Sequence, residues 1–132
     1  MGDIRRNLFA PVVTESFAFL VEEYGCIGPV FSDDWPPNHR GGLDAAYHSR
    51  DFDVDVMLSV DYGRDAYVWV FLVRPPTNRS RDRRVDLLAH ELGLAKLQSV
   101  PVSARTGYQL RHSLRAQAEL TRRLLRNATE HP

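Results

Sequence analysis

The stretch FDVDVMLSVD, residues 52–61, decides the fold. Val54, Val56 and Leu58 alternate with positions that are mostly polar, beginning with Asp53 and Asp55. A period of two residues is typical of a β-strand with one face in a core and the other toward solvent. We therefore predict a half-buried strand that carries both aspartates on its polar face.

A second strand follows this one almost at once. Residues 62–65, YGRD, have turn composition, and residues 66–74, AYVWVFLVR, are almost wholly β-branched or aromatic. The short turn predicts an antiparallel hairpin. Because the second strand is apolar on both faces, either the aromatic set of Tyr67, Trp69 and Phe71 or the set that begins at Val68 shares the side of Asp53. The sequence leaves both arrangements open.

The rest of the chain completes an α+β pattern. Apolar spacings of three and four predict a helix over residues 8–24, with Asn7 as its cap and Gly25 as a left-handed stop. Two more strands are predicted over 26–31 and 43–48. Asp82 is the expected cap of a short helix that ends at Gly93, and the Thr106-x-x-Gln109 capping box predicts a helix to about residue 127.

These elements predict the order α-β-β-β-β-α-α. Strands joined by short turns pair antiparallel, so we expect a meander sheet of about four strands, with an N-terminal helix and two C-terminal helices on one face. The C-terminal helix would lie beside the first helix or over a sheet edge. The 132 residues suffice for one core, and we predict a single domain over residues 1–132.

The single cysteine and the apolar runs restrict where the protein acts. Cys26 has no partner for an intrachain disulfide, and we find no signal peptide, so a reducing cytoplasm is the expected compartment. No apolar run approaches the roughly 18 to 20 residues that span a bilayer. Membrane insertion is therefore not expected.

The sequence offers little to catalysis or to a cofactor. The run HELGL at residues 90–94 begins like a zinc-protease helix, but Leu94 stands where the second histidine would be needed. No phosphate-binding loop or nucleophile elbow is present. We predict no catalytic residue, no metal and no cofactor, and a small enzyme that uses Asp53, Asp55 and a histidine is the weakest of three hypotheses.

The leading hypothesis is a non-enzymatic protein-interaction module. An apolar strip beside acidic side chains suits a partner surface, where aromatic residues supply much of the binding energy. The candidate partner-binding residues lie on the predicted hairpin: Asp53, Asp55, Tyr67, Trp69 and Phe71. A homodimer is the expected partner arrangement, and a different protein is the other. The alternative for the apolar strand is that the C-terminal helix covers it.

The runner-up is a nucleic-acid or polyanion-binding module. Residues 1–73 carry five arginines and twelve acids, and residues 74–132 carry twelve basic residues and five acids, so a zero total hides charges of −7 and +7. One stripe of the last helix holds Arg111, Arg115, Arg122 and Arg126. This stripe could bind a polyanion, bind an acidic protein partner, or simply be the solvated face of the helix. Because the net charge of the chain is zero, nucleic acid is the least expected of these ligands. The two charged halves can also neutralise each other within the fold.

The segment FAFLVEEYG at residues 17–25, followed by a meander that contains Tyr47, Val54, Val56 and Val60, resembles the helix-first α+β domains of uncharacterised small bacterial proteins. Some domains of that shape resemble immunity proteins of toxin systems. The resemblance covers residues 8–74 and carries over no functional residue. It implies a helix-first α+β fold and a protein-binding role.

Overall fold

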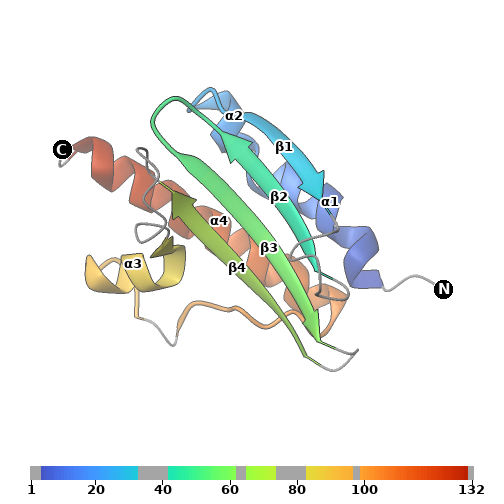
Figure 1. Ribbon diagram of the computed structural model, residues 1–132. Coiled ribbons are helices and arrows are strands. Elements are labelled where there is room, and N and C mark those ends of the chain that lie inside the picture. Colours follow the sequence, from blue (N-terminus) through green and yellow to red (C-terminus); the bar gives the residue numbers. More distant parts are fainter. Residues whose placement is uncertain (1–3, 33–41, 62–64, 74–82, 97–98, 131–132) are drawn as a thin grey trace.

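A computed structural model describes residues 4–32, 42–61, 65–73, 83–96 and 99–130. Its sheet has the order β1-β2-β3-β4-β5, and every neighbouring pair is antiparallel (Figure 1). The strands are β1 (Ile27–Ser32), β2 (Leu43–His48), β3 (Asp53–Asp61), β4 (Asp65–Val73) and β5 (Arg83–Arg84). The predicted meander is confirmed, and the two-residue β5 is an addition to it.

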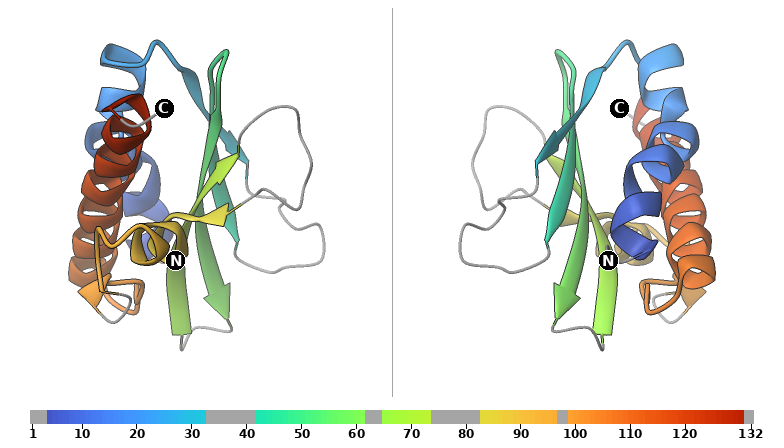
Figure 2. Two further views of the ribbon diagram at one scale, coloured as in Figure 1. Left: turned by 90° about the vertical axis from the view of Figure 1, so that its left-hand side faces the viewer. Right: turned by 90° about the vertical axis from the view of Figure 1, so that its right-hand side faces the viewer.

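The helices form a second layer on one face of this sheet. They are α1 (Ile4–Ser16), α2 (Ala18–Glu22), α3 (Val85–Glu91) and α4 (Gly107–Glu130), and Figure 2 shows all four on the same side. The long C-terminal helix α4 packs beside α1, which is one of the two placements that the sequence left open. The core lies between the layers, where the sheet contributes a row of buried side chains: Ala45, Tyr47, Val54, Val56, Leu58, Val68, Val70 and Leu72.

The first helix differs from the prediction of one helix over 8–24. It begins at Ile4, so that Asn7 lies inside it, and it breaks at Phe17 into α1 and α2. In a continuous helix, Phe17 and Phe19 would point about 200° apart. The break lets both side chains enter the core, where their rings stack with centroids 6.2 Å apart. Periodicity alone could not reveal this, since it assumes an unbroken helix.

The predicted helix ends are largely correct. Gly25 has a φ of +68° two residues beyond Glu23, the C-cap of α2, and Gly93 has a φ of +72° after α3, so both stop signals are confirmed. Thr106 Oγ1 accepts a hydrogen bond from the backbone N–H of Gln109 at 3.0 Å, which caps α4. The reciprocal bond is shifted by one residue, because Gln109 Oε1 accepts from the N–H of Arg105. The predicted cap Asp82 lies outside the described residues, and Arg84 precedes α3.

The outer edge of β4 is closed by the segment before α4. Tyr67 forms a bridge with Ser103, and the N–H of Val68 donates to the carbonyl of Val102. The fully buried amide of Gln117 donates to the carbonyls of Val68 and Pro101, at 2.8 and 3.2 Å. This side chain of α4 thereby supplies donors that a further strand would otherwise provide.

Candidate functional site

The sheet face that points away from the helices is the candidate site, and we call it the open face. The buried Val68, Val70 and Leu72 of β4 point to the helix layer, so the intervening Tyr67, Trp69 and Phe71 point to the open face. The structure thus resolves the alternative that the sequence left open: the aromatic set shares a side with the aspartates. In the described part of the chain no helix covers this face (Figure 2).

Strand register places acids and aromatic rings in adjoining rows of the open face. Asp55 of β3 lies opposite Phe71 of β4, and Met57 lies opposite Trp69. Tyr67 and Trp69 stack with ring centroids 5.7 Å apart, and Tyr67 remains 38% exposed. The structure therefore brings together the five residues that were predicted to bind a partner, although Asp53 lies toward one end of the group.

Asp44 is a member of this face that sequence reasoning missed. It lies on β2 opposite Met57, next to Ala46, which pairs with Asp55. Partial burial is the larger cause and the nearby negative charge of Asp55 is the smaller one, and together they raise the pKa of Asp44 from 3.8 to about 6. The alternation of Leu43, Ala45 and Tyr47 around it was the available signal, since these apolar positions place Asp44 on the polar face.

Arg84 is the second residue that was missed. Its guanidinium lies over the Trp69 ring, 4.1 Å from the ring centroid. Two hydrogen bonds to the buried carboxylate of Asp86, at 3.0 and 2.6 Å, fix the orientation of that guanidinium. Trp69 and Arg84 are fifteen residues apart, so no local pattern could have predicted the contact. It shows that this aromatic row accommodates a stacked cation.

One histidine contacts the acidic part of the open face. His48 Nδ1 lies 3.0 Å from Asp53 Oδ1 at the end of the β2–β3 hairpin. Within the described ranges, no three side chains of His, Cys, Asp or Glu gather in a way that could bind a metal ion. For the hypothesis of an enzyme built on Asp53, Asp55 and a histidine, the described residues thus offer one histidine–aspartate contact, that of His48 with Asp53.

The predicted arginine stripe of α4 lies in the other layer. Arg122 forms an ion pair of 2.6 Å with Glu23, and Arg126 lies 3.8 Å from the same carboxylate. Arg115 lies 3.8 Å from Glu15, while Arg111 is exposed. Acids of the N-terminal half therefore meet bases of the C-terminal half within the fold. These pairs reduce the charge that three of the four arginines could offer to a polyanion.

Two further findings concern the chain as a whole. None of the helices described here has both the length and the apolar character that crossing a bilayer requires. The chain matches no known protein family, no curated protein and no solved structure. Its function is therefore inferred from its own residues.

Proposed function

We propose that this protein is a non-enzymatic interaction module of the cytoplasm, and that its open face binds a basic segment of another protein. The observation that carries the proposal is the aromatic row of Tyr67, Trp69 and Phe71 on a sheet face that the described helices leave uncovered. Aromatic rings at such a surface are the side chains that contribute most to protein binding. The buried free thiol of Cys26 supports the proposed reducing compartment.

Charge selects the kind of partner. Asp44, Asp53 and Asp55 accompany the aromatic row, so a segment with arginine or lysine complements the face. Arg84 provides an internal example, because its guanidinium already stacks on Trp69. A partner arginine has the same chemistry available at Phe71, which lies opposite the carboxylate of Asp55.

A homodimer through the open face is the competing arrangement. A two-fold contact places the same patch of both copies together, so one interface would contain the three aspartates of each chain. Like charges at an interface disfavour association. We therefore favour a different, basic protein, and an immunity-like role belongs to this proposal because it too requires a protein-binding surface.

The proposal can be tested with a displayed library of random peptides selected on the intact protein. We expect the selected peptides to be rich in arginine and lysine, and Tyr67→Ser to weaken their binding about tenfold. Tyr108→Ser is the matched control, because Tyr108 is an exposed tyrosine on α4 in the opposite layer. Neutral or acidic peptides, or equal binding by the two variants, would refute the proposal.

Sedimentation of the unmodified protein distinguishes a homodimer through the open face from a monomer that binds a different, basic protein. A monomer at high concentration is expected. A dimer that Tyr67→Asp converts to a folded monomer would show that a second copy occupies the open face, and the basic partner would then be wrong.

A further inference from the structure

The solvent-facing side of α4, in the layer opposite the open face, carries an exposed pair of aromatic rings. Tyr108 is 80% exposed, more than any other large hydrophobic side chain among the described residues. Its ring lies nearly parallel to that of His112, with an interplanar angle of 7° and centroids 6.3 Å apart. His112 is exposed as well, one turn further along the helix. Because the core uses neither ring, the pair offers a flat platform to a ligand from solvent.

Arginines follow this platform along the same face of α4. At about 100° per residue, three of them fall within about 60° of Tyr108 around the helix axis: Arg111, Arg115 and Arg123. All three side chains are exposed. From Tyr108 to Arg123 the helix rises about 22 Å, at 1.5 Å for each residue. The rings and the guanidiniums therefore form a line that suits a polymer of several charged units better than a single small molecule.

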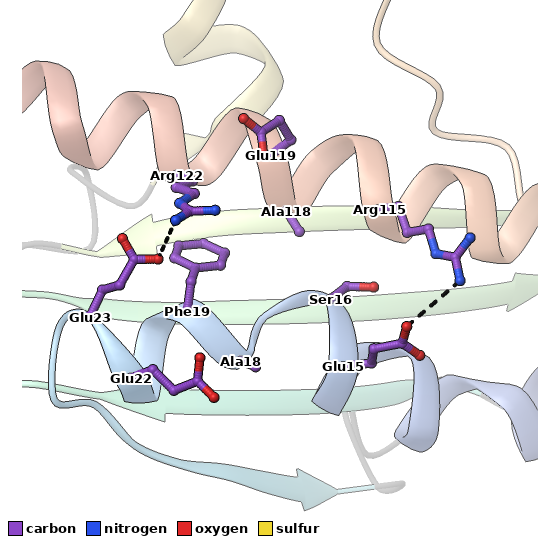
Figure 3. Close-up of a pocket in the computed structure, with 10 residues that line it drawn as sticks. All are labelled: Glu15, Ser16, Ala18, Phe19, Glu22, Glu23, Arg115, Ala118, Glu119 and Arg122. Atoms are coloured by element: carbon purple, nitrogen blue, oxygen red, sulfur yellow. Dashed lines mark ion pairs between the residues drawn. The ribbon is translucent and has the colours of Figure 1, made fainter.

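Acids of the first two helices neutralise one border of this face, as Figure 3 shows. A cleft of about 300 Å³ lies there, between the break in the first helix and α4. Arg122 forms its 2.6 Å ion pair with Glu23, which Arg126 also approaches. Arg115 lies 3.8 Å from Glu15, and both of these side chains are more than half exposed. Such a long, exposed pair contributes little to stability, so Arg115 can leave Glu15 at little cost.

The charges of this region leave a small positive excess. Besides the two glutamates in ion pairs, Glu22 lines the cleft and Glu119 is exposed on α4 itself. Four carboxylates thus meet five guanidiniums of α4, at positions 111, 115, 122, 123 and 126. Within the described part of the chain, no ion pair involves Arg111 or Arg123. These two guanidiniums are therefore available to an anionic ligand.

We propose that the outer face of α4 binds a single strand of nucleic acid. A base stacks on Tyr108 beside His112, and the phosphates that follow it contact the three exposed arginines. Stacking on aromatic side chains requires bases that are not already paired, so the platform selects single strands over duplexes. An acidic protein segment would use the guanidiniums and leave the two rings without a role. This site is independent of the open face, which lies in the other layer.

Fluorescence anisotropy of the full chain, with a labelled thymidine or uridine strand of about 15 nucleotides, tests this inference. We expect a dissociation constant on the order of 10 μM at about 50 mM salt. Three phosphate contacts predict that binding weakens about tenfold when the salt is raised to about 200 mM. A duplex of the thymidine strand with its complement should bind at least about tenfold more weakly than the single strand.

Substitutions separate the platform from the arginines. Tyr108→Ser should weaken binding about tenfold, whereas Tyr67→Ser on the open face should leave it unchanged, so failure here and failure of the proposed function are distinguishable. Arg123→Gln should weaken binding about threefold, while Arg50→Gln in the exposed turn between β2 and β3 should not change it. Glu119→Gln should strengthen binding, because it removes a negative charge from the same face. All five side chains are at least partly exposed, so the variants should fold.

A labelled glutamate peptide with as many charges as the strand distinguishes an acidic protein partner. It should bind at least about tenfold more weakly than the single strand, because it has no base for the Tyr108 ring. A peptide or a duplex that binds as tightly as the single strand, equal effects of the two tyrosine variants, or no binding at about 50 mM salt would each overturn the proposal.

Discussion

Replacing Asp44 by asparagine should stabilise the protein at neutral pH and leave it almost unchanged in acid. Partial burial, together with the charge of Asp55, raises the pKa of Asp44 to about 6 in the folded chain. The ordinary value of 3.8 applies when the chain unfolds. Because the folded pKa is the higher one, the folded chain binds this proton more tightly. The ionised carboxylate therefore costs stability above pH 6, and that cost is relieved as the pH falls from 6 toward 4.

The size of the effect follows from the two pKa values. A value of about 6 against 3.8 corresponds to at most about 3 kcal/mol at neutral pH. Asp44 is only half-buried, and solvent screens its charge, so we expect about 1 kcal/mol. Asparagine keeps the shape of the side chain and removes the charge. The stability gained by Asp44→Asn should be smaller in a chain that already carries Asp55→Asn, because the repulsion between the two carboxylates is then already absent.

Urea unfolding at about pH 7.5 and about pH 4 measures this difference directly. Asp44→Asn should unfold at higher urea than the unmodified protein at the first pH, and at nearly the same urea at the second. Asp51→Asn is the control, because Asp51 is exposed in the turn between β2 and β3. An equal gain at both pH values, or a loss at neutral pH, would show that the charge of Asp44 is not the cause.

Four other substitutions test the packing of the fold, each by urea unfolding. Gln117→Leu removes the buried amide that bonds the carbonyls of Val68 and Pro101 and should cost about 2 to 3 kcal/mol, while Glu119→Gln on the exposed side of α4 should change little. Thr106→Ala should cost about 1 kcal/mol through loss of the α4 cap, and Thr106→Ser should retain it. Gly25→Ala meets only backbone strain, because its φ is +68° with open space around it, and should cost about 1 kcal/mol. Gly28→Ala should cost more, on the order of 3 kcal/mol, because its new Cβ would lie 2.6 Å from the carbonyl oxygen of Ala46; equal losses at the two glycines would contradict the predicted clash.

Local patterns in the sequence predicted most of the secondary structure and its order. The alternation over residues 52–61 determined β3, the glycines at positions 25 and 93 determined two helix ends, and Thr106 determined the start of α4. Each of these signals acts within a few residues, because a strand repeats every two residues and a cap bonds a neighbour three positions away. The α+β meander follows from them, since short turns restrict successive strands to antiparallel neighbours.

Only the tertiary structure decided how these elements form surfaces. The helices were expected on one face of the sheet, but β4 is apolar on both of its faces, so its sequence did not indicate whether the aromatic row or the row of Val68 would face those helices. The stacking of Arg84 on Trp69, the coupling of Asp44 to Asp55 and the cleft at the break near Phe17 each join residues from different elements. Such contacts depend on strand register and on the competition of several side chains for one core. No single stretch of this sequence contains that information.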